Sequence, residues 1–182
     1  MTTEFDKPNF LVRPFELDDE DEVTDILKYW TVNRHIGETV VEADELSNSI
    51  VHLIGNLGMI NTNFWVAADE SSGSILGFAS VHPLSEGLSS FSNSDEPYEI
   101  THNFVRFDYL GREIGTAIIR HIERTTQEKG GRELLVLSGI RYRETSWKFY
   151  DKHFGPAIST IDDYYGENAP ACIWRQSLRP PA

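Results

Sequence analysis

Hydrophobic positions recur along the chain with two different periods, and the changes of period divide the chain into elements. Leu11–Phe15 is a short apolar run that predicts a strand. An acidic run at Glu16–Glu22 follows, and apolar side chains then return at helical spacing. This predicts a helix that Asp18 or Asp19 caps at its start. The same spacing predicts a second helix at Glu42–Leu57.

The next third of the chain is dominated by strand-forming residues. Phe64–Ala68 and Ile75–Val81 are apolar runs separated by the turn-type sequence DESSGS, which predicts an antiparallel hairpin. His82–Pro97 is rich in serine, proline and acidic residues and predicts a long loop. Tyr98–Phe107 predicts a further strand. Long loops in compact domains are often functional, so this loop is a candidate part of a site.

The C-terminal part mixes both periods. Glu113–Lys129 predicts a strong amphipathic helix that the following glycine pair ends, and Glu133–Ser138 predicts a fully buried strand. A short helix is predicted at Thr145–His153, and strands at Ala157–Ile161 and Ala171–Gln176. The order of elements indicates a mixed α/β (α+β) fold and not a regular βαβ repeat.

Length and charge narrow the class of protein. The 182 residues are expected to form one domain, 1–182, with flexible termini at 1–10 and 179–182. The net charge of −13 disfavours nucleic acid and anionic membranes as partners. The chain has no apolar run of about 20 residues, and its first ten residues, MTTEFDKPNF, have no basic start and no apolar core, so they are not expected to act as a secretory leader. Its single cysteine, Cys172, fits a reducing compartment, so a cytoplasmic location is expected.

One strand–turn–helix unit carries the chemistry. The strand Tyr98–Phe107 leads through a tight turn into a helix near Glu113. A helix N-terminus offers unpaired N–H groups and a partial positive charge, which suit a phosphate or pyrophosphate. Gly111 and Gly115 allow close approach of a ligand, and Thr116 adds a hydroxyl donor. The spacing alone is equally compatible with a turn that binds nothing.

The sequence VRFDYLGREIGTAII, from Val105 to Ile119, resembles the acyl-CoA motif of the GNAT superfamily of N-acetyltransferases. In that motif a strand ending in valine precedes Arg/Gln-x-x-Gly-x-Gly/Ala at the start of an amphipathic helix. Gly115 matches the last glycine, whereas Leu110 stands at the Arg/Gln position and Glu113 at the middle glycine. The resemblance extends over about Val12–Leu178, through the hairpin with Gly77 and the aromatic segment WKFYDKHF.

The resemblance implies a GNAT-like fold, with a central, mostly antiparallel sheet flanked by about four helices. It also implies an acyl-CoA-dependent N-acyltransferase that uses acetyl-CoA as co-substrate. The residues expected to bind acetyl-CoA are Asn103, Phe104, Val105, Leu110, Gly111, Arg112, Ile114, Gly115 and Thr116.

Two residues are expected to move protons. Glu99, six residues before Val105, matches the position of a glutamate general base in some members of the family. Tyr150 matches the family tyrosine that protonates the leaving thiolate, for which a phenol is a suitable acid. Regular alternation would place Glu99 on the same face as Asn103, and His102 on the other face, where it is a weaker alternative base.

The acceptor is expected to be the primary amine of a small molecule. The acidic loops favour a cationic acceptor, and Trp30 and Glu38 are the expected acceptor-binding residues. The segment around them loosely resembles phosphinothricin-type acetyltransferases. Two alternatives stay open: a weak or inactive GNAT-fold binding module, and an enzyme acting on protein or peptide amines. Neither metal nor membrane is expected as a partner, and a monomer and a homodimer are both compatible with the sequence.

Overall fold

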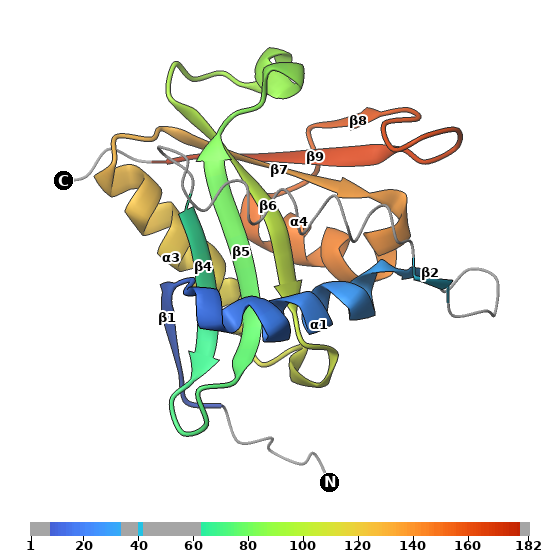
Figure 1. The fold of residues 1–182 in the computed structure, drawn as a ribbon. Coiled ribbons are helices and arrows are strands. Elements are labelled where there is room, and N and C mark those ends of the chain that lie inside the picture. Colours follow the sequence, from blue (N-terminus) through green and yellow to red (C-terminus); the bar gives the residue numbers. More distant parts are fainter. Residues whose placement is uncertain (1–7, 34–39, 42–62, 179–182) are drawn as a thin grey trace, which may run out of the picture. The chain divides into compact units, whose positions relative to one another are not determined.

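The computed structural model describes residues 8–33, 40–41 and 63–178 (Figure 1). Its strands are β1 Phe10–Pro14, β2 Val32–Asn33, β3 Val40–Val41, β4 Asn63–Asp69, β5 Ile75–Pro83, β6 Pro97–Val105, β7 Glu133–Gly139, β8 Ser159–Ile161 and β9 Ala171–Ser177. Its α-helices within these residues are α1 Glu20–Thr31, α3 Ile114–Glu128 and α4 Lys148–Phe154. The helix predicted at Glu42–Leu57 lies outside the described residues.

Seven strands pair in the order β1-β4-β5-β6-β7-β9-β8. The pairs β1–β4, β7–β9 and β8–β9 are antiparallel, whereas β6 and β7 are parallel from the pair Pro97–Glu133 to the pair Ile100–Val136. The predicted mixed α/β class with a mostly antiparallel sheet is therefore confirmed. The predicted hairpin is also present, as β4 and β5.

The chain folds as two compact units, and each is described by itself. The first contains the residues up to Ser80 together with His102–His121. The second contains Val81–Thr101 and the chain from Ile122 onward. The boundaries between the units fall within β5, β6 and α3, so each unit contains one part of each of these three elements.

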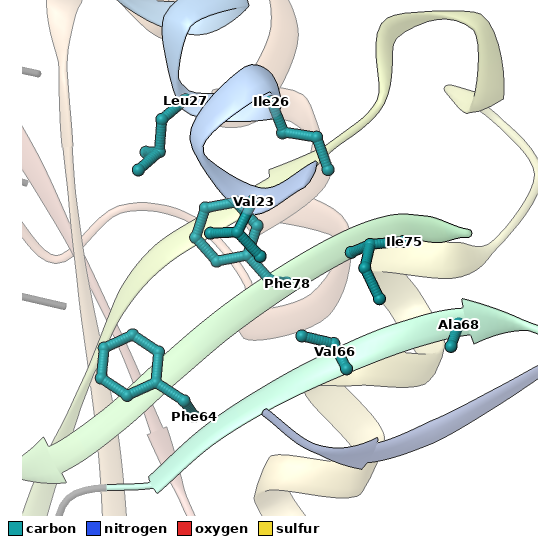
Figure 2. Packing of buried hydrophobic residues seen from close by; sticks show 8 residues of the cluster. All are labelled: Val23, Ile26, Leu27, Phe64, Val66, Ala68, Ile75 and Phe78. Carbon is teal, nitrogen blue, oxygen red and sulfur yellow. The ribbon is translucent and has the colours of Figure 1, made fainter. Parts of the chain in front are cut away.

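The core of the first unit forms between α1 and the hairpin β4–β5 (Figure 2). Val23, Ile26 and Leu27 recur at helical spacing on one side of α1 and are buried. They pack against Phe64 and other side chains of β4 and β5, and the partly buried Phe15, Trp30 and Phe104 complete the cluster. The hydrophobic period read from the sequence therefore identifies the buried face of α1.

A buried ion pair fixes the entry into α1. Asp19 accepts two hydrogen bonds of 2.7 Å from the guanidinium of Arg13 and one of 2.8 Å from the backbone N–H of Glu16. Burial alone would raise the pKa of the Asp19 carboxyl, but these hydrogen bonds and the charge of Arg13 outweigh it and lower the pKa. The N-cap is thus Glu16 and not the predicted Asp18 or Asp19. Asp19 is instead the N3 residue of a capping box, in a 3₁₀ turn at Leu17–Asp19 that precedes α1.

The segment predicted as a loop at His82–Pro97 is more ordered than expected. Strand β5 continues to Pro83, and Glu86–Phe91 forms a 3₁₀ segment whose Leu88 is buried against Leu135 and Ile173. The polar composition of the segment favours a loop, and its one buried leucine is too weak a signal in the sequence to indicate that the segment packs into a core. The segment lies in the second unit and belongs to its core.

A buried carboxylate fastens the same segment to the sheet. Glu133 at the start of β7 is 2% exposed and accepts hydrogen bonds from the Ser92 hydroxyl, at 2.6 Å, and from the Asn93 N–H, at 3.0 Å. Arg175 of β9 lies 3.6 Å from the same carboxylate and donates to the carbonyl of Phe91 at 2.8 Å. Both the charge and the oxygens of Glu133 are therefore satisfied by these contacts, which a buried carboxylate requires.

Candidate active site

The end of β6 meets the start of α3 above a glycine of β5. A Cβ placed on Gly77 would stand 2.9 Å from the carbonyl oxygen of Phe104 and 3.2–3.3 Å from side-chain atoms of Val105 and Ile114. Only glycine allows the backbones to approach so closely without a shift. Gly77 therefore sets the distance between the predicted strand end and the predicted helix start, all within the first unit.

Two hydrogen bonds fix the end of β6. The indole N–H of Trp30 donates to the carbonyl of Val105 at 2.8 Å, and the N–H of Arg106 donates to the carbonyl of Leu76 at 2.8 Å. The ring of Trp30 also stacks near Phe104, with centroids 6.2 Å apart. Trp30, predicted to bind the acceptor, thus has a structural role in positioning β6, and its role toward the acceptor stays a prediction.

The turn that follows β6 uses left-handed backbone twice. Phe107–Tyr109 forms a 3₁₀ turn, after which Gly111 has φ 77° and Glu113 has φ 65°. Glycine adopts this conformation at no steric cost, whereas a residue with a side chain is strained there. Position 113 is the one where the GNAT motif carries its middle glycine. The structure explains that preference, and it shows that Glu113 is held in a strained conformation.

Helix α3 begins immediately after this strained residue. The first bond of its ladder runs from the Ala117 N–H to the Glu113 carbonyl, at 2.9 Å, so the N–H groups of Ile114, Gly115 and Thr116 precede the ladder. The buried side chain of Ile114 anchors this end of the helix. The helix start provides the polarised N–H groups that a pyrophosphate needs, and the close approach at Gly77 leaves little side-chain bulk behind it. These residues fit acetyl-CoA.

Some charged side chains around the turn form ion pairs with neighbouring charged side chains. Arg106 lies 3.7 Å from Glu22 and 3.7 Å from Asp108, while Arg112 stacks over the ring of Tyr109 at 4.8 Å. Leu110, at the family's Arg/Gln position, is 42% exposed. Arg106 also lies over the Tyr109 ring, at 6.0 Å, so both arginines of this turn contact the same ring. A shallow pocket beside the helix start is lined by Pro8, Phe10, Arg112, Glu113, Thr116, Ala117 and Arg120.

Glu99, the predicted base, is buried in the second unit with 7% of its surface exposed. Its carboxylate accepts a 2.7 Å hydrogen bond from the hydroxyl of Ser85 and a 3.3 Å bond from the Ser85 N–H. Within the described ranges no lysine or arginine forms an ion pair with it. The carboxyl group is therefore oriented by the two neutral donors of Ser85.

Tyr150, the predicted acid, is buried on α4 in the same unit, among aromatic rings. Its ring centroid lies 5.3 Å from that of Trp174, and Phe149 and Phe154 flank it at 5.4 and 6.1 Å. A hydrogen bond of 2.8 Å from the Trp174 indole to Asp151 ties the helix to β9. Tyr150 and Glu99 thus lie in different surroundings, one aromatic and one polar.

His102 alters the geometry of β6 in a way that regular alternation does not predict. Its φ of 52° interrupts the extended backbone, so the expectation that Glu99 and Asn103 share one face does not carry across it. The His102 ring nitrogen Nδ1 lies 3.2 Å from the hydroxyl of Ser80. The strand is therefore deformed between the predicted base and the predicted acyl-binding residues Asn103, Phe104 and Val105.

The sequence did not indicate the roles of two site residues. Ser85 lies 14 positions before its partner Glu99, and no local pattern connects the two. Gly77 is part of the family resemblance, but its close approach to β6 was not predicted, although a lone glycine inside an apolar strand is itself a signal of such an approach. Glu38, predicted to bind the acceptor, lies outside the described residues.

Among residues 8–33, 40–41 and 63–178, no three His, Cys, Asp or Glu side chains gather as a metal site would require. No helix in those ranges combines the length and apolar character needed to cross a bilayer.

Comparisons with known proteins agree with this geometry. Residues 17–155 match the family model described as the acetyltransferase (GNAT) family. Among solved structures, an aminoglycoside 6'-N-acetyltransferase complexed with coenzyme A is similar with a TM-score of 0.70 at 14% identity, covering 94% of this chain and 99% of that one. An N-acetyltransferase from Staphylococcus aureus Mu50 gives 0.68 at 17% identity, with the same coverage of 94% and 99%. The aminoglycoside 6'-N-acetyltransferase from Enterococcus faecium gives 0.68 at 14%, again covering 94% and 99%. No curated protein matches.

Proposed function

Since the chain belongs to the acetyltransferase (GNAT) family, we propose that it transfers an acetyl group from acetyl-CoA to a primary amine of a small molecule. The family membership makes it an acyl-CoA-dependent N-acyltransferase. The acceptor class and the residues that act are inferred from the site itself.

The observation that carries the proposal is the environment of Glu99. The Glu99 carboxyl group is 7% exposed, and the Ser85 hydroxyl and N–H both donate to one of its oxygens. Such a group attracts an ammonium ion and can accept its proton. A substrate carboxylate would be repelled at the same position. This supports an amine acceptor and a direct-attack reaction.

The roles of the residues follow from the reaction. Glu99 accepts a proton from the bound ammonium, and the neutral amine nitrogen then forms a bond to the thioester carbonyl carbon. Backbone N–H groups of Asn103–Val105 polarise that carbonyl. As the carbon–sulfur bond breaks, Tyr150 gives its phenolic proton to the sulfur and CoA leaves as a thiol. The nitrogen, cationic after its attack, loses its extra proton to become the amide, and this proton restores the Tyr150 phenol. Glu99 returns its proton to solvent. The N–H groups at the start of α3 bind the pyrophosphate, supported by Leu110, Gly111 and Arg112.

The test is release of free CoA thiol from acetyl-CoA in the presence of a panel of acceptors: a diamine, an aminoglycoside, lysine and, as an acidic counterpart, glutamate. We expect release with the cationic amines. Glu99→Gln should lower kcat/KM by about 10²–10⁴-fold, and Tyr150→Phe by about 10²-fold, with acetyl-CoA binding by calorimetry unchanged in both. Unchanged turnover in both variants would contradict these roles.

A second candidate function is favoured by Glu113. Its left-handed backbone and its carboxylate stand where the GNAT motif has glycine, at the edge of the pyrophosphate position. A negative charge at a helix N-terminus competes with a phosphate for the same field. A member of the family with weak CoA binding, acting as a sensor module, would fit this feature. The thiol-release assay and the calorimetric titration together separate the two candidates, because a sensor binds CoA in the titration but releases no thiol with any amine.

A further inference from the structure

Val105, at the end of β6, turns both of its backbone polar groups away from β5. The N–H of Arg106 donates to the Leu76 carbonyl of β5 at 2.8 Å. The carbonyl oxygen of Phe104 lies against Gly77 of the same strand. Along an extended strand, the N–H and C=O of one residue point to the same side, and those of the next residue point to the other side. The N–H and C=O of Val105 therefore face away from β5.

On that other side of β6, strand pairing ends before it reaches Val105. The last pair of the parallel ladder with β7 contains Ile100, and the left-handed residue His102 follows it. A backbone carbonyl removed from water needs a partner, because leaving it unpaired costs free energy. The indole N–H of Trp30 supplies this partner, at 2.8 Å from the Val105 carbonyl oxygen. The indole thus takes the place of a neighbouring strand for the carbonyl and does not use the N–H of the same residue.

Helix α1 holds the Trp30 ring firmly against this segment, within the first unit. Near its start, Glu22 lies 3.7 Å from Arg106. Near its end, the ring of Tyr29 lies against that of Phe107, with centroids 5.1 Å apart. The helix therefore contacts the turn after β6 on both sides of the indole. A donor carried on such a rigid element keeps its direction better than one carried on a loop.

We propose that Trp30 is a positioning residue for acyl transfer, which keeps the Val105 N–H aimed at the thioester carbonyl oxygen of acetyl-CoA. This inference rests on the proposed function, in which that N–H helps to polarise the thioester. The indole bond holds the carbonyl end of the planar peptide group between Val105 and Arg106, and the bond to Leu76 holds its N–H end. The peptide group cannot rotate while both bonds are present, so Val105 keeps its orientation.

The indole N–H also acts on the electrostatics of the reaction. The Val105 carbonyl faces the same side as the Val105 N–H, so its oxygen would stand near the oxygen of the bound thioester. The thioester oxygen gains negative charge in the transition state, and an unpaired carbonyl oxygen beside it would oppose this charge. The hydrogen bond from Trp30 partly neutralises the carbonyl. Trp30 therefore acts through Val105 and needs no contact with the substrate for this role.

The test is the carbon-13 NMR resonance of acetyl-CoA labelled at its carbonyl carbon and bound to the protein without an acceptor. Polarisation of the carbonyl by a hydrogen bond moves this resonance downfield from its position in free acetyl-CoA. Trp30→Phe keeps an aromatic ring and removes the N–H, so we expect less than half of the wild-type displacement. Trp30→His loses ring bulk, but its Nε2 is two bonds from Cγ, as the indole nitrogen is, and can donate to the same carbonyl. We expect it to keep most of the displacement.

Trp65→Phe is the matched control, because it makes the same chemical change in the same unit. Among the described residues, the buried indole N–H of Trp65 has no hydrogen-bond partner. This variant should therefore show the wild-type resonance. Since the sample contains no acceptor, a role of Trp30 in binding the amine cannot produce the expected difference.

Turnover with 1,4-diaminobutane as acceptor gives a second readout. Trp30→Phe should lower kcat about tenfold and leave the KM for acetyl-CoA within about twofold of wild type. Trp30→His should have the higher kcat of the two variants and the lower stability in urea, because it loses more of the ring. For a residue that only supports packing, kcat would follow stability, and this order would be reversed.

The outcomes separate this inference from the proposed function. A bound resonance in Trp30→Phe equal to that of Trp65→Phe overturns the inference, and so does a folded Trp30→His with the resonance of Trp30→Phe. If Trp30→His does not fold, the comparison of the two phenylalanine variants decides alone. If wild type binds acetyl-CoA with the displaced resonance but transfers acetyl to no amine, the proposed function fails while the positioning by Trp30 stands. A wild type that does not bind acetyl-CoA contradicts both.

Discussion

Gly77 and the carbonyl oxygen of Phe104 approach so closely that a Cβ on residue 77 would stand 2.9 Å from that oxygen. Real Cβ contacts of this kind with backbone atoms are not tolerated without a shift. The approach joins β5 to the end of β6 at the start of α3, where we propose that acetyl-CoA binds. Stability and acetyl-CoA binding should therefore depend together on this glycine.

We predict that Gly77→Ala lowers the free energy of unfolding by about 1–3 kcal/mol, because the neighbouring backbone must move. It should also weaken acetyl-CoA binding in calorimetry. Gly87→Ala is the matched control, since a Cβ there meets nothing within 4 Å. An unfolding free energy for Gly77→Ala equal to that of the control would show that the strands adjust without cost.

Glu113 allows strain and charge to be separated with two variants. Glu113→Gly should relieve the backbone strain at φ 65° and raise the free energy of unfolding by up to about 1 kcal/mol. Glu113→Gln keeps the strain and removes only the charge, so its stability should not rise. If the carboxylate competes with the pyrophosphate, both variants bind CoA about threefold or more tightly. Unchanged CoA affinity in Glu113→Gln would mean that the carboxylate points away.

The Arg13–Asp19 pair makes stability depend on pH in an acidic window. The pKa of Asp19 is lowered in the folded protein, so the stabilisation is fully present above the ordinary aspartate pKa, near 3.9, and is lost as the pH falls through the lower folded value. Asp19→Asn should cost about 1–3 kcal/mol at pH 7 and should flatten the loss of stability below about pH 4. Urea unfolding at several pH values measures both effects.

The control for this variant is Asp25→Asn, because Asp25 meets Lys28 only at an exposed 3.3 Å contact. Such surface pairs contribute little, so its stability and its pH dependence should match wild type. A flat difference between Asp19→Asn and wild type from pH 7 down to about pH 2 would contradict the linkage.

The sequence predicted those elements that side-chain periodicity alone determines. The face of α1 that carries Val23, Ile26 and Leu27, the β4–β5 hairpin and the buried strand β7 follow directly from the spacing of apolar residues. The boundaries of α3 were predicted to within one residue because Gly130 and Gly131 end it clearly.

Side-chain periodicity could not predict features that depend on single backbone angles or on residues distant in the sequence. The left-handed conformations of His102 and Glu113 leave no trace in the hydrophobic pattern, since neither residue type demands them. The contact of Ser85 with Glu99 and that of Tyr165 with Gly139 join segments that only the tertiary fold brings together. For the same reason, the sequence identified Glu99 only through resemblance and did not reveal what surrounds it.

The hydrogen bonds that buried Glu133 accepts from Ser92 and Asn93 have a thermodynamic consequence for the proposed binding of an amine near Ser85 and Glu99. Glu133 holds Ser92 and Asn93, and the buried Leu88, whose N–H donates to the Ser85 carbonyl at 3.0 Å, holds the part of the segment next to Ser85. Ordering a comparable stretch of free chain would cost roughly 1–2 kcal/mol per residue, and this cost falls on folding and not on substrate binding. An amine would therefore find Ser85 already in place, so weak contacts could suffice for recognition. Slow amide hydrogen exchange at Asn93 would be experimental evidence of that preorganisation.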